Sequence, residues 1–93
     1  MYLAKICGNV VSTQKNQFLK GQKLLLVRKI DLKGNYISNK DEIALDIVDS
    51  GIGDVVLVVK EGAAIQQILG HSNSPVNIMI IAVVDNISID NNI

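Results

Sequence analysis

Apolar residues occur along this chain in short segments that either alternate with polar residues or run continuously, and turn-forming residues separate them. The segments are short and rich in β-branched side chains, so the pattern predicts strands rather than long helices. Only residues 61–69 have apolar side chains at helical spacing, and Gly70 follows them at a position where helices commonly end. The expected strands cover residues 2–13, 23–30, 42–48, 54–60 and 77–85.

Five strands with one short helix before the last strand predict a mainly β fold. The expected architecture is a small five-stranded barrel related to the oligonucleotide-binding fold. Gly8 interrupts the first strand, and a glycine there suits the sharp bend of a barrel strand. The 93 residues contain no evident linker or internal repeat, so we expect a single domain over residues 1–93.

Two of the predicted strands are apolar on both faces, at residues 55–59 and 78–84. A barrel has one interior, and one short helix is not expected to cover its outside. Another copy of the same chain is the simplest cover, so the pattern predicts a homo-oligomer. In this interpretation Val56 and Val58 lie on the outer face, at the subunit interface.

Charge and aromatic content bear on one alternative, a small barrel that binds single-stranded nucleic acid. Such binding uses a basic groove with aromatic side chains for stacking. The chain has nine basic and nine acidic residues and only 3% aromatic residues, which argues against nucleic acid as a partner. The densest basic group, Lys15, Lys20 and Lys23, is interpreted as part of a solvated loop.

The remaining composition predicts a soluble intracellular protein. The longest apolar run, residues 78–84, is far too short for a membrane span, so no membrane association is expected. A single cysteine, Cys7, excludes an internal disulfide and fits a reducing cytosol.

No motif predicts catalysis, a metal or a cofactor. The glycine turn at residues 51–53 precedes a strand, whereas a phosphate-binding glycine loop precedes a helix. Asp46, Asp49 and Asp54 flank this turn, but the residues between them do not supply the alternating oxygens of a calcium loop. The only histidine, His71, is far from the only cysteine in the sequence, so the two do not predict a zinc site.

Four segments together carry a resemblance that covers nearly the whole chain. In order and spacing, residues 3–15, 19–25, 44–57 and 81–85 resemble the pentameric vertex proteins of bacterial microcompartment shells, the EutN/CcmL family. One departure lies in the glycine turn, where the family usually has Gly-Ala-Gly and this chain has Asp49-Ser50-Gly51.

The resemblance implies a structural protein with no catalysis. It implies a cyclic pentamer, with a hexamer as the alternative, that caps the five-fold vertices of a cytoplasmic shell beside hexameric shell proteins. Thr13 and Lys15 join the two valines above as candidate interface residues. The candidate residues for the central opening are Asp49, Ser50, Gly51 and Ile52, where a ring of carboxylates would favour cations. Alternatively, Asp49 points sideways and caps a turn through its own side chain.

Overall fold

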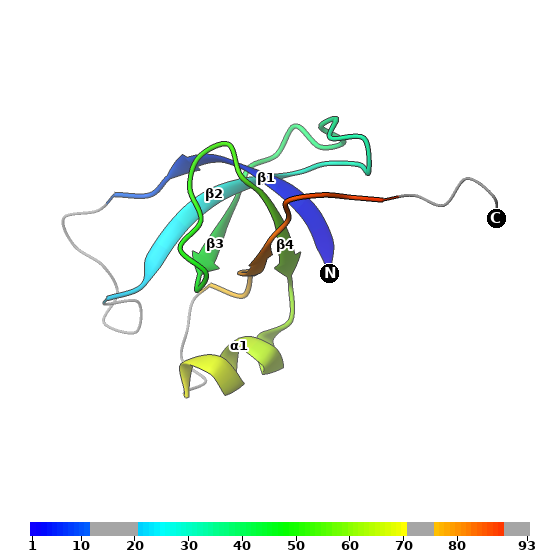
Figure 1. Cartoon of the computed structure of the whole chain (residues 1–93). Coiled ribbons are helices and arrows are strands. Elements are labelled where there is room, and N and C mark those ends of the chain that lie inside the picture. Colours follow the sequence, from blue (N-terminus) through cyan, green and yellow to red (C-terminus); the bar gives the residue numbers. More distant parts are fainter. Residues whose placement is uncertain (12–20, 71–75, 89–93) are drawn as a thin grey trace.

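The computed structural model describes residues 1–11, 21–70 and 76–88 of the chain (Figure 1). They form a closed five-stranded barrel with one short helix, which confirms the mainly β prediction. Each of the six observed elements is shorter than its predicted range by one to four residues at one or both ends. The elements in chain order are β1 (Tyr2–Asn9), β2 (Lys23–Lys29), β3 (Glu42–Asp46), β4 (Val55–Val59), α1 (Gly62–Leu69) and β5 (Met79–Val83).

The strands follow the order β1-β2-β3-β5-β4 around the barrel, and β4 pairs back onto β1 to close it. Four of the five pairings are antiparallel, whereas β3 and β5 pair in parallel through Leu45 with Met79 and Asp46 with Ile80. The helix α1 lies in the connection that carries the chain from β4 to β5. The barrel therefore closes through contacts between segments that are distant in sequence.

The barrel interior is filled by aliphatic side chains from all five strands and from the residue before β5. This interior cluster consists of Ala4, Ile6, Leu25, Val27, Ala44, Val56, Val58, Ile78 and Ile80.

The prediction that Val56 and Val58 face outward is therefore wrong, because both side chains are fully buried inside the barrel. Successive side chains of a strand point to opposite faces, so Val55, Leu57 and Val59 are the outward-facing residues of β4. A continuous apolar run does not reveal which alternate set faces inward. The pairing of β4 with β1 and β5 determines which alternate side chains of β4 face the interior.

A second apolar cluster lies on the outer face of the barrel, where α1 covers one end (Figure 1). Ile65 of α1 is 1% exposed and belongs to one buried cluster with side chains of β2, β3, β4 and β5. The helix thus covers part of the outside, more than the sequence led us to expect. The members of this cluster are Leu24, Leu45, Val59, Ile65 and Met79.

The helix ends as its sequence predicts. Gly70 has a left-handed φ of 78°, and its N–H donates to the carbonyl of Gln66 at 2.8 Å. Among the described residues, no helix is long and apolar enough to span a membrane.

Candidate functional site

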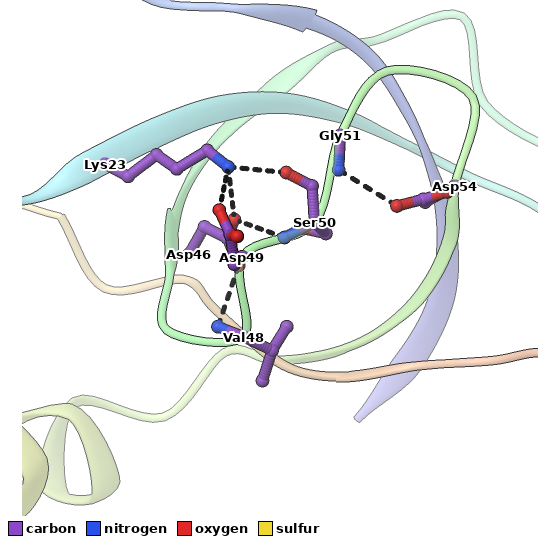
Figure 2. Close-up of polar contacts among 7 residues, drawn as sticks. All are labelled: Lys23, Asp46, Val48, Asp49, Ser50, Gly51 and Asp54. Atoms are coloured by element: carbon purple, nitrogen blue, oxygen red, sulfur yellow. Dashed lines mark hydrogen bonds and ion pairs between the residues drawn. The ribbon is translucent and has the colours of Figure 1, made fainter.

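The candidate opening residues lie in the loop of residues 47–54, which connects β3 to β4. The buried carboxylate of Asp46, the last residue of β3, organises the first half of this loop (Figure 2). Its Oδ1 accepts a hydrogen bond from the N–H of Val48 at 3.0 Å, and its Oδ2 accepts one from the N–H of Ser50 at 2.8 Å. One side chain therefore fixes the backbone where the chain leaves the strand.

The second half of the loop is held by Asp54 and by β1. Oδ2 of Asp54 accepts a hydrogen bond from the N–H of Gly51 at 2.9 Å (Figure 2). The N–H of Asp54 donates to the carbonyl of Gly51 at 3.0 Å. The N–H of Gly53 donates to the carbonyl of Ile6, while the N–H of Ile6 donates to the carbonyl of Asp54, both at 2.9 Å. The loop is thus tied to the barrel wall at its far end.

Lys23 at the start of β2 links the loop to a neighbouring strand. Its Nζ donates to the carbonyl of Ser50 at 2.6 Å and lies 3.1 Å from Oδ1 of Asp49 and 3.3 Å from Oδ2 of Asp46 (Figure 2). The hydrogen bond with Asp49 is the main cause of the raised pKa of the Lys23 ammonium. Lys23 is solvated as expected, with a side chain that is 44% exposed, but it opens β2 and holds the neighbouring loop instead of lying in a loop itself.

Asp49 has a backbone conformation that favours glycine, with a φ of 56°. Aspartate is one of the few side chains that tolerate the left-handed region, so the chain keeps this turn without a glycine. Its side chain is 98% exposed, and within the described part of the chain its carboxylate contacts only Lys23. The backbone N–H groups of the loop that donate to a carboxylate donate to Asp46 and Asp54 instead.

Ser50 and Ile52 differ sharply in exposure. Ile52 is 67% exposed at the tip of the loop, whereas Ser50 is 2% exposed. The Ser50 hydroxyl is buried and has no hydrogen-bond partner among the residues that the structure describes. Both residues border a pocket of about 420 Å³ between the loop and the neighbouring ends of β1 and β2. The residues that line it are Asn9, Val10, Lys23, Leu24, Leu25, Ser50, Gly51 and Ile52.

The other residues named from the sequence do not join this loop. Val56 and Val58 are inside the barrel. Thr13, Lys15 and His71 lie outside the described residues.

Cys7 is exposed on β1, and its Sγ lies 3.4 Å from Oδ1 of Asp41. Partial burial, followed by the bond to Asp41, raises the pKa of the Cys7 thiol, which is the opposite of what an activated thiolate needs. Within residues 1–11, 21–70 and 76–88, no three acidic, cysteine or histidine side chains gather as a metal site would require.

Sequence reasoning missed the link between Lys23 and Asp46. The two residues are register partners in the β2–β3 pair, where opposite charges stabilise a sheet. The signal was present as a lysine opening one predicted strand and an aspartate closing the next. It becomes visible only when the register of the two strands is known.

Comparison with known proteins places the whole fold among shell vertex proteins. The family described as ethanolamine utilisation protein EutN/carboxysome matches residues 1–85. The chain is 38% identical over 90 residues to the carboxysome shell vertex protein CcmL of Nostoc sp., covering 97% of this chain and 88% of that protein. It is 36% identical over 91 residues to the microcompartment shell vertex protein PduN of Salmonella typhimurium, covering 95% and 99% respectively.

Solved structures agree with these sequence matches. The structure of CcmL from Gloeobacter violaceus superposes with a TM-score of 0.83 at 35% identity and covers 98% of this chain and 92% of that chain. GrpN of Rhodospirillum rubrum, a pentameric microcompartment shell protein, superposes with a TM-score of 0.80 at 33% identity. This match covers 97% of the present chain and 100% of GrpN.

Proposed function

Because the chain belongs to the EutN/CcmL family of bacterial microcompartment shell vertex proteins, we propose that it assembles into a pentamer that closes the vertices of such a shell. The role of the family is structural rather than catalytic. The observation that carries the proposal is the closed barrel, which overlaps a pentameric shell protein over the full length of that protein.

The proposed mechanism is geometric. Hexagonal tiles alone form a flat sheet, and twelve pentagonal units introduce the curvature that closes a polyhedron. In this arrangement the pentamer fills five-fold positions between hexameric shell proteins, and each protomer contributes the same surfaces to the ring.

Two measurements test this proposal. Light scattering coupled to size-exclusion chromatography should give five chain masses for the purified protein. Coexpression with hexameric shell proteins should give closed polyhedra, whereas omission of this chain should give open sheets or tubes in electron micrographs. A ring of six chains, or closed shells of unchanged shape without this chain, would contradict the proposed role.

We propose also that the loop of residues 47–54 approaches the five-fold axis, where symmetry repeats its charges. Asp46, Asp49 and Asp54 carry three carboxylates in each protomer against the one ammonium of Lys23, so the excess charge is negative. The side chain of Asp49 supports this proposal, because it is 98% exposed to solvent even though its carboxylate pairs with Lys23. Such a ring favours cations over anionic metabolites.

The axial position of Asp49 predicts a salt-dependent effect. Like charges that converge on an axis repel each other, and salt screens exposed charges. Asp49→Asn should therefore raise the melting temperature of the ring at low salt, and the gain should shrink as salt is added. The matched control is Asp85→Asn, which changes an exposed acid on the segment after β5. An Asp49→Asn ring that melts at or below the temperature of the unaltered ring in low salt would place Asp49 away from the axis.

A further inference from the structure

The pocket between the loop of residues 47–54 and the barrel wall has no part in the vertex role proposed above. Its volume of about 420 Å³ lies within the range of roughly 300–1,000 Å³ that small-molecule pockets have. Its lining comes from the loop, from the end of β1 with the residue after it, and from the first residues of β2. The pocket is therefore large enough for a small ligand and is built from three separate segments of the chain.

Backbone hydrogen bonds hold the walls of this pocket in place. The N–H of Val10 donates to the carbonyl of Leu24 at 3.1 Å, which continues the β1–β2 pairing past the end of β1. On the loop, Asp46 accepts from the N–H of Ser50 at 2.8 Å, and Lys23 donates to the Ser50 carbonyl at 2.6 Å (Figure 2). The walls are thus fixed in the free protein, and a preformed site loses little free energy to reorganisation when a ligand binds.

Ser50 brings an unused hydrogen-bonding group to the pocket wall. Its backbone is bonded on both sides, but its hydroxyl is buried and has no partner among the residues that the structure describes. A buried hydroxyl without a partner is unfavourable, and native proteins rarely keep one. Rotation about a single bond moves a serine hydroxyl between staggered positions, so a molecule seated in the pocket can serve as its partner.

The charge in the pocket wall disfavours charged ligands. Among the described residues that line the pocket, only Lys23 is charged. Its Nζ lies within 3.3 Å of oxygens from Ser50, Asp49 and Asp46, which together engage all the N–H donors of an ammonium, so none remains for an incoming anion. A ligand cation would lie beside the Lys23 ammonium, and the two carboxylates that could attract it do not line the pocket. The pocket therefore suits an uncharged molecule.

We propose that this pocket binds a small uncharged molecule that has an aliphatic body and one hydrogen-bonding group, such as an amide. The aliphatic body packs against Val10, Leu24 and Ile52, and the polar group bonds to the Ser50 hydroxyl and the Asn9 side-chain amide. Both of these side chains can donate and accept. Apolar walls with a few polar groups are typical of small-molecule sites. The proposal goes beyond the vertex role and does not depend on the number of chains in the ring.

Pentanamide, pentanoate and pentylammonium test the charge preference at neutral pH, because they share one carbon chain and differ in charge. Each probe is titrated into the isotope-labelled protein while the backbone amide signals are followed by NMR. With pentanamide, the signals of Val10, Ser50 and Gly51 should shift and saturate at millimolar concentration. The two charged probes should bind more weakly by about tenfold or more, because a charge must lose its hydration to enter the pocket. Equal affinities for the probes, or no saturable shift at these residues, would overturn the proposal.

Ser50→Ala separates ligand binding from folding. Because the Ser50 hydroxyl has no partner among the described residues, its removal should leave the melting temperature of the free protein unchanged or higher. The same variant should bind pentanamide more weakly by about fivefold, the effect of one lost hydrogen bond. The matched control is Ser38→Ala, which removes a serine hydroxyl outside the pocket and should leave the affinity unchanged. Unchanged affinity in Ser50→Ala, or a marked loss of its melting temperature, would overturn the proposal, because the hydroxyl would then serve no ligand or would serve the fold.

Discussion

The buried carboxylate of Asp46 allows the strongest stability prediction for the candidate loop. Its side chain is 0% exposed and accepts hydrogen bonds from the N–H groups of Val48 and Ser50. Asp46→Ala removes both acceptors and leaves the buried N–H of Ser50 without a partner. Each hydrogen bond to a charged group contributes about 1.5–3 kcal/mol. Water can replace part of the Val48 bond because Val48 is only partly buried, so we expect a loss of about 3–5 kcal/mol.

Urea denaturation measures this loss as the free energy of unfolding per protomer. All variants must be compared at one protomer concentration, because the apparent stability of an oligomer depends on concentration. A loss of this size is a large part of the roughly 5–15 kcal/mol that stabilises a typical domain.

Two variants calibrate the measurement. Asp46→Asn keeps one acceptor oxygen and should lose about half as much free energy as Asp46→Ala. Asp85→Ala removes an exposed acid and should change the free energy of unfolding by less than about 0.5 kcal/mol. If Asp46→Ala loses less than about 1 kcal/mol, or no more than Asp85→Ala, Asp46 does not organise the loop.

Three further outcomes are expected. Asp49→Ala should be less stable than Asp49→Gly by about 1 kcal/mol in urea, because glycine tolerates the positive φ; equal stability would contradict the strained turn. Backbone hydrogen bonds, chiefly from Asn35, lower the pKa of Asp31 below 3.8, so its contribution to stability is present above that value and disappears as pH falls through the lowered pKa. The melting temperature of Asp31→Asn should therefore fall less steeply as the pH is lowered than that of the unaltered protein. If it falls equally steeply, groups other than Asp31 cause the loss of stability in acid. Ile65→Ala should lose about 2–5 kcal/mol and Ile68→Ala less than about 1 kcal/mol, since only Ile65 is buried; similar losses would mean that α1 does not pack through Ile65.

The elements of the fold could be predicted from the sequence because each depends on local patterns. β-branched runs, one helical stripe and Gly70 were sufficient to place five strands and α1 in the correct order. The inward set of side chains was not predictable in β4, because every residue of its run is a valine or a leucine. Val56 and Val58 face inward only because of how β4 pairs with its neighbours, and these pairings are not local.

The candidate loop was predictable in position but not in its contacts. The glycine turn and its aspartates were evident in the sequence, and Asp54 holds the turn through its side chain. The role of Lys23 depends on the register between β2 and β3. The positive φ of Asp49 was not predictable, because aspartate adopts the left-handed region only occasionally and the sequence does not say where.

The parallel pairing of β3 with β5 has a consequence for how the chain folds. Only two register pairs join these strands, whereas each antiparallel pairing contains four or five. Parallel pairs are also slightly weaker per residue. The β3–β5 seam should therefore be the first of the five pairings to open in native-state hydrogen exchange. An open seam turns the barrel into a sheet with two free edges, and free edges pair with other chains. A newly made subunit is thus most prone to aggregation while this seam is unformed.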